Sequence, residues 1–190
     1  MKILILMSLL FTSCATKQLV LTTSELLPYK ESAQVTKINF QTKSVNILKI
    51  VDKREETTYG FAYTGVQYQK TPLIFNENLN ILLMDYFSTA LDVRNISVAL
   101  DGRPLEIEVE KLWVEEVIEN FQPEKAKCVV RLNFHMNLPE EKWSGKYWAE
   151  YISEGDLVDG TERLAPTLAS CLNEIVEKLV NDQKFINLLK

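Results

Sequence analysis

The chain has 190 residues, with 21 Lys and Arg against 26 Asp and Glu, so its net charge at pH 7 is −5. This acidic balance argues against nucleic acid as a partner, and against adhesion to anionic lipid headgroups, because both need a basic face. The length suits one domain with a sizeable core.

The first fourteen residues predict export and lipid attachment. Lys2 precedes an apolar run over residues 3–11, and two small residues then lead into Cys14. The run is about half of the roughly 20 residues that a membrane span needs, so it predicts a signal peptide. The segment resembles the signal peptide and lipobox of bacterial lipoproteins. That resemblance implies cleavage before Cys14 and acylation of its thiol and amine, palmitate being a typical acyl group. The alternative is a short apolar segment packed into the domain.

The resemblance also suggests a location and a division of the chain. Ala15 stands where Asp would retain a lipoprotein of enteric bacteria in the inner membrane, which implies the outer membrane, facing the periplasm. We expect a signal peptide over 1–13, and a lipidated N-terminus and tether over 14–44 with a short edge strand at 19–21. A single α+β domain follows over 45–190.

Hydrophobic periodicity predicts the elements of that domain. Val45–Asp52 has the pattern of a buried strand, and 78–93 carries apolar residues at helical spacings of three and four. A strand that alternates from Leu105 changes parity near Glu110 and Lys111, which predicts a β-bulge. Further strands are expected at 126–138 and 143–152, and helices at 164–180 and about 183–189. The economical fold is a two-layer sandwich: a mostly antiparallel sheet with two amphipathic helices on one face.

Several of these features occur together in one family. The first strand of the domain ends in an Asp-x-Arg element, Asp52-Lys53-Arg54, with Gly60 after it, and the C-terminal helix ends in the residues 182–185. With the lipobox, the chain resembles the YajG-like lipoproteins, small uncharacterised envelope proteins of bacteria. A weaker likeness is to the auxiliary lipoproteins of ABC-type lipid transporters. Neither resemblance supplies catalytic residues, so we expect no enzymatic activity.

The segment after this strand is the best candidate for a partner-binding surface. Its aromatic residues are Tyr59, Phe61, Tyr63 and Tyr68, and the first three alternate, so they are expected on one face of a strand. Aromatic side chains dominate the energetics of protein contacts. The alternative is that they pack against a neighbouring sheet as ordinary strand residues.

Two pairs have a structural interpretation. Asp52 and Arg54 are expected to organise a loop through a charge-assisted hydrogen bond, the alternative being a solvated strand end. Cys128 and Cys171 lie on the apolar faces of a strand and a helix. They are either two buried thiols or a disulfide, which an exported protein can form.

The polar residues predict neither a metal site nor a cofactor. His135 is the only histidine and has no partner at the spacing of a triad or zinc site, so a solvent-facing side chain is expected. Glu106, Glu108 and Glu110 are expected to form a soluble strand face that pairs in part with Lys127 and Arg131.

These patterns predict a membrane-anchored accessory or binding subunit without enzymatic activity. Its partners would be the membrane, reached through the lipid, and an unidentified envelope protein. The alternative is an auxiliary lipoprotein of an ABC-type lipid transport system that binds an apolar ligand between sheet and helices.

Overall fold

The computed structural model describes residues 19–22, 26, 36–39, 43–64, 69–118, 125–154 and 163–190. Cys14, the expected lipid attachment site, and Tyr68, the last aromatic residue of the candidate surface, lie outside these ranges.

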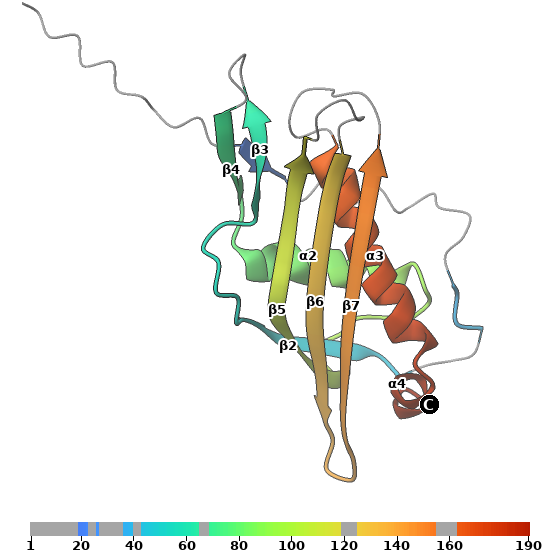
Figure 1. Ribbon diagram of the computed structural model, residues 1–190. Coiled ribbons are helices and arrows are strands. Elements are labelled where there is room, and N and C mark those ends of the chain that lie inside the picture. Colours follow the sequence, from blue (N-terminus) through green and yellow to red (C-terminus); the bar gives the residue numbers. More distant parts are fainter. Residues whose placement is uncertain are drawn as a thin grey trace, which may run out of the picture.

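An open sheet of seven strands forms the frame of the described residues (Figure 1). Its neighbours follow the order β1-β4-β3-β5-β6-β7, and β2 lies beside the first half of β5. The strands are β1 (Leu19–Leu21), β2 (Val45–Asp52), β3 (Gly60–Thr64), β4 (Gln69–Phe75), β5 (Arg103–Val117), β6 (Lys125–Asn137) and β7 (Lys142–Glu154).

The expected antiparallel arrangement is confirmed for part of this sheet. β5, β6 and β7 form the predicted antiparallel meander, and β3 pairs with β4 in the same sense. The pairs β1–β4, β2–β5 and β3–β5 are parallel. Parallel neighbours need a crossover connection, and a helix within the chain between β2 and β5 allows one.

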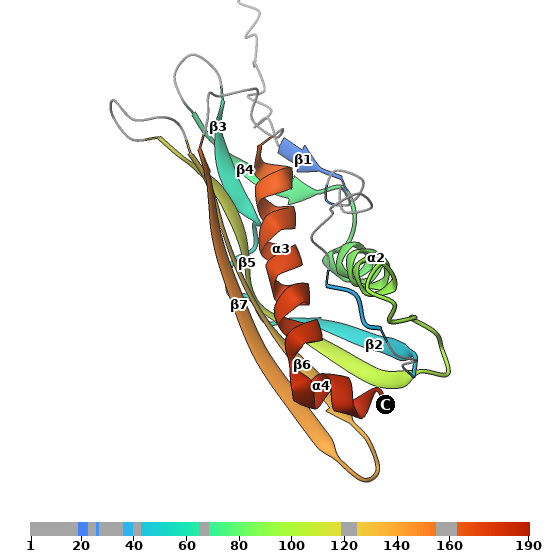
Figure 2. The same ribbon diagram turned by 90° about the vertical axis from the view of Figure 1, so that its right-hand side faces the viewer.

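The helices α2 (Leu79–Asp92) and α3 (Leu164–Asn181) lie on the same side of the sheet (Figure 2). Asn78 caps α2, its side chain accepting a hydrogen bond from the amide of Asn80. The short helix α4 (Gln183–Leu188) follows α3 after one residue. The opposite face of the sheet carries no helix among the described residues, and we call it the outer face.

The core lies between the sheet and these helices. Alternate residues of β6 and one stripe of α3 are fully buried, and so are Leu21 and Leu26 from the stretch expected as a tether. A disulfide between Cys128 of β6 and Cys171 of α3 crosses this core, with the two Cα atoms 6.4 Å apart.

Polar contacts also join the elements of the core layer. The side chain of Arg94, fully buried after the end of α2, donates to both Glu177 of α3 (2.6 and 3.0 Å) and the carbonyl of Ala90 (2.6 Å). Asp182 caps α4 and accepts from Tyr147 Oη at 2.6 Å. Burial by itself raises the pKa of Asp182, but the hydrogen bonds that its carboxylate accepts outweigh this effect, so the pKa ends below its ordinary value.

The predicted bulge in β5 is confirmed. The pairing of β5 with β6 changes register between Val109 and Lys111, which leaves Glu110 as the extra residue. Because of this extra residue, both Val109 and Leu112 face the core although their positions differ in parity.

The expected partners of the glutamate row act on it only in part: the hydrogen bond from Lys146 chiefly lowers the pKa of Glu110, and the charge of Arg131 adds to this shift. The close ion pairs of the row are made with other lysines. Glu106 contacts Lys49 at 3.0 Å and Glu108 contacts Lys53 at 2.7 Å, because the parallel strand β2 and the residue after it run beside this part of β5. Glu110 pairs with Lys146 of β7 at 2.7 Å. Of the expected partners, Lys127 forms its close ion pair with Glu150 at 2.6 Å. Arg131 lies opposite Lys111 of β5 and Trp148 of β7 in the sheet register. The side chain of His135 is only partly exposed, and its Nε2 lies 3.6 Å from Glu108.

Candidate functional site

A buried arginine organises the turn between β2 and β3. Arg54 donates through Nε and Nη2 to the two carboxylate oxygens of Asp52 (2.9 and 2.8 Å), and through Nη1 to the carbonyl of Thr58 (3.2 Å). Its side chain is only 3% exposed. The hydrogen bond from Arg54 lowers the pKa of Asp52, and burial opposes this shift only in part, so the carboxylate stays charged at neutral pH. The pair therefore fixes the path of the chain from β2 towards β3.

The same arginine holds the residue before β3. Its guanidinium lies 4.2 Å from the ring centroid of Tyr59, and that ring packs on Phe75 with centroids 4.2 Å apart. The next residue, Gly60, has a φ of 138°, and a Cβ there would lie 1.6 Å from the carbonyl oxygen of Val114. Only glycine fits this close approach, which brings β3 alongside β5.

β3 then presents two aromatic side chains on the outer face. Phe61 and Tyr63 alternate with the buried Ala62, and their ring centroids lie 5.7 Å apart in an edge-to-face arrangement. Trp113 of β5 alternates with buried residues in the same way, and its ring lies 6.1 Å from that of Phe61. We call Phe61, Tyr63 and Trp113 the aromatic cluster.

Charged groups surround the aromatic cluster. Lys70 Nζ lies 3.4 Å from the ring centroid of Phe61, and Lys111 Nζ lies 5.1 Å from that of Trp113. Glu116, whose side chain points to the opposite face and is 3% exposed, accepts a hydrogen bond from the amide of Tyr63 at 2.6 Å. Cations over aromatic faces and a buried acceptor at the end of β3 hold the cluster in one geometry.

The structure thus brings together part of the surface predicted from the sequence. Phe61 and Tyr63 share a face, whereas Tyr59 packs against Phe75 of the core, and Tyr68 lies outside the described residues. Trp113 lies beside Phe61 because β3 pairs with β5 in parallel, and no local pattern in the sequence predicts that pairing.

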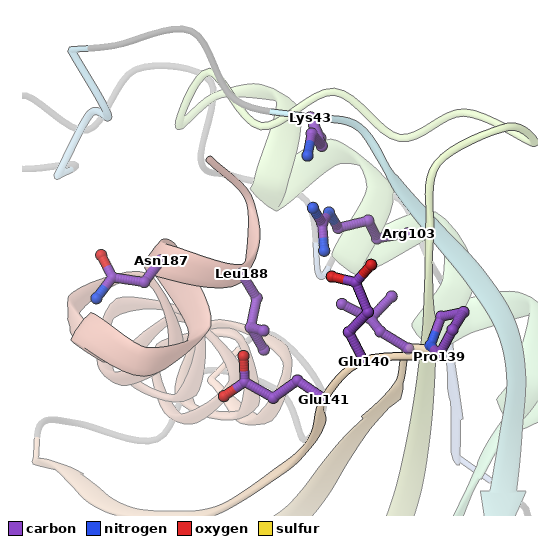
Figure 3. A pocket seen from close by; sticks show the side chains of 8 residues that line it. Lys43, Arg103, Pro139, Glu140, Glu141, Asn187 and Leu188 are labelled. Atoms are coloured by element: carbon purple, nitrogen blue, oxygen red, sulfur yellow. The ribbon is translucent and has the colours of Figure 1, made fainter.

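A second candidate site is a cleft of about 470 Å³ near α4 and the turn between β6 and β7. Figure 3 shows Lys43 and Arg103 on one side, with Glu140 extending towards Arg103 from the turn. Arg103 Nε is buried and has no hydrogen-bond partner among the described residues. Since the cleft carries both signs of charge, it selects no single class of ligand. The lining residues are Lys43, Arg103, Leu138, Pro139, Glu140, Glu141, Asn187 and Leu188.

The described residues were compared with the usual features of a metal site and of a membrane-spanning helix. Within the ranges given above, no group of three or more His, Cys, Asp or Glu side chains is placed to hold a metal ion. None of the helices in this part of the chain is long and apolar enough to span a bilayer.

Comparison with known proteins identifies the class as lipoproteins. The model of a family described as "Uncharacterized lipoprotein" matches residues 32–190. The chain therefore belongs to this family, the YajG family of uncharacterised lipoproteins, as its sequence predicts. No curated protein matches the chain.

One solved structure supports the fold. Protein XCC0632 from Xanthomonas campestris, described with the family model DUF330, is 12% identical, with a TM-score of 0.59 over 89% of this chain and 96% of that one. A structure described only as an uncharacterized protein is also 12% identical, with a TM-score of 0.43 over 71% of this chain and 90% of the other. At this identity, the first similarity shows a shared fold.

Proposed function

We propose that the protein is a non-enzymatic binding subunit of the bacterial envelope, anchored by lipid at Cys14, and that the aromatic cluster contacts another envelope protein. The observation that carries the proposal is the cluster itself. Three rings, on a sheet face that no helix of the described residues covers, are held by edge-to-face contacts and by two lysines. Rigid, partly exposed aromatic side chains of this kind form the energetic centres of protein interfaces.

The anchor limits where the partner can be. Cys14 precedes Leu19, the first residue of β1, by five residues, and an extended chain spans at most about 3.6 Å per residue, or ~18 Å in all. Leu19 pairs with Leu73, and the neighbouring Pro72 pairs with Phe61. A lipid on Cys14 therefore keeps the aromatic cluster near the bilayer, which favours a partner in or on the same membrane, here taken as the outer membrane on its periplasmic side.

The alternative role in lipid transport receives less support from the described residues. An apolar ligand would need space between the sheet and α3, yet this layer is filled by fully buried side chains such as Val130, Leu168 and Leu172. The cleft near α4 is lined by charged groups as well as apolar ones, and it lies outside this layer. The binding subunit is therefore the function that the geometry supports best.

Membrane attachment is tested by replacing the acceptor cysteine. The wild-type chain should fractionate with membranes after a high-salt wash, and Cys14→Ala should leave a folded domain that no longer does so. Pelleting of the Cys14→Ala chain under the same wash would contradict the anchor.

The binding surface is tested by photocrosslinking in intact cells. A photoreactive amino acid at Phe61 should give a crosslinked product of one defined size, whereas the same residue at Ile81, which is 55% exposed on α2, should not. The product should disappear when Trp113→Ala is added. Equal crosslinking from both positions, or crosslinks to lipid alone, would show that the cluster is not the contact surface.

A further inference from the structure

β7 is a long strand with one open side. It pairs with β6 over all thirteen of its residues, and it ends the strand order of the sheet in the described part of the chain (Figure 1). An edge strand of this length offers a row of backbone donors and acceptors to another strand. The question is which strand fits it.

The order of the charged side chains along β7 indicates which strand would fit. Basic residues occupy the first half of its outer face and acidic residues the second half, with a tryptophan between them. In sequence order, this face carries Lys142, Ser144, Lys146, Trp148, Glu150, Ile152 and Glu154.

This order is complementary to itself when reversed. We propose that two copies of the chain pair through β7, antiparallel and about a two-fold axis at Trp148, so that their sheets become one. In this register Lys146 lies opposite Glu150 of the second copy, and Lys142 lies opposite Glu154. Each cross-strand charge pair then occurs twice, and no like charges oppose one another.

Neighbouring registers lack this match. A two-fold axis at Lys146 opposes two lysines, and an axis at Glu150 opposes two glutamates. An axis at Tyr147 or Ala149 leaves no Lys–Glu pair in direct opposition. The charge pattern therefore selects the Trp148 register among those that keep each side chain on its own face.

Exposure and existing ion pairs support the same arrangement. Trp148 is 57% exposed although it is the largest apolar side chain on the outer face of β7, and a facing tryptophan would cover it. Within one copy, Lys146 already pairs with Glu110 and Glu150 with Lys127. Pairing would extend these contacts into a row of alternating charge that runs from one copy to the other.

In a single copy, the centre of this edge is covered by a lysine. Lys178 of α3 donates to the carbonyl oxygen of Trp148 at 2.5 Å, with Nζ 5.3 Å from the indole ring. Lysines commonly protect exposed edge strands in this way. Pairing would exchange this hydrogen bond for one from a backbone amide of the second copy, so Lys178→Ala should strengthen the dimer.

Charge-reversal variants test the register. The mass of the full chain in detergent is measured by sedimentation. Wild type should be a dimer. Lys146→Glu alone and Glu150→Lys alone should each weaken the dimer by about tenfold or more, because each places like charges in opposition twice. An equal mixture of the two variants should form a mixed dimer, since each meets the opposite charge on the other. A monomeric wild type, or a mixture that stays apart, would overturn the proposal, as would single variants that dimerise like wild type.

Crosslinking in native membranes tests the axis independently. With Trp148→Cys, mild oxidation should join two copies, because the residue faces itself. Ser144→Cys serves as the control, since it faces Ile152 and lies several residues from its own counterpart. Crosslinking at 144 but not at 148 would refute the Trp148 axis. Capture of a different protein at 148 would show that the edge serves another partner.

Discussion

The disulfide between β6 and α3 gives a prediction with a defined magnitude. Cys128 and Cys171 are 43 residues apart, and the loop-closure relation gives about 13 cal/mol/K of lost chain entropy for such a loop. At 25 °C this corresponds to about 4 kcal/mol in the free energy of unfolding. With a urea m-value of about 2 kcal/mol/M, reduction should lower the unfolding midpoint by about 2 M.

The assay is urea unfolding of residues 15–190, followed by far-ultraviolet circular dichroism with and without reductant. Cys128→Ala/Cys171→Ala should unfold at or below the midpoint of the reduced wild type, and reductant should not change it. The reasoning fails if reduction leaves the wild-type midpoint in place. It also fails if the untreated protein, once denatured, releases two reactive thiols.

Three further predictions concern single side chains. Gly60→Ala places a Cβ 1.6 Å from a β5 carbonyl oxygen and should destabilise the domain by at least about 2 kcal/mol in urea unfolding. Gly145→Ala, whose Cβ has side-chain atoms rather than backbone atoms as its nearest neighbours, should cost less. Arg94→Met leaves the carboxylate of Glu177 without its arginine partner and should lower the free energy of unfolding by about 3–5 kcal/mol. Adding Glu177→Leu should recover part of this loss. Additive losses would show that the two residues are not coupled. The pKa of Asp182 is lowered in the folded state, so its contribution to stability is present above the ordinary pKa of 3.8 and is lost as the pH falls through the folded pKa. Asp182→Asn should therefore lower stability at neutral pH but not in strong acid, and an equal loss at both would contradict this linkage.

The local elements could be predicted from the sequence because their signals are local. The stripe of α3 and the parity change at Glu110 depend on residues within a few positions of one another. The opposite faces of Trp143 and Trp148 follow from strand alternation in the same way: the first is 7% exposed and the second 57%.

The parallel pairings were not predictable by the same means. Gly60 pairs with Val114, more than fifty residues further along the chain, and no pattern in either segment indicates that the two are neighbours. Trp113 therefore joins the candidate surface only in the folded chain, and Tyr59 leaves it because the turn held by Arg54 places that ring on Phe75.

Buried polar groups were missed for a related reason. Arg94 follows the apolar stripe of α2, where a charged residue normally indicates a helix end in water. Its partner Glu177 lies 83 residues further along, on a different helix. Only the packing of α2 near α3 makes this position an interior one.

The extra residue at Glu110 has a consequence for how relatives of this protein should be compared. A relative without it would carry the second half of β5 one position out of phase. An alignment that matches only residue counts would then equate inward-facing with outward-facing side chains from Lys111 onward. Placing a one-residue gap at position 110 in such relatives aligns Trp113 with the residue that occupies the same outward-facing position. The contact surfaces of these lipoproteins can then be compared residue by residue.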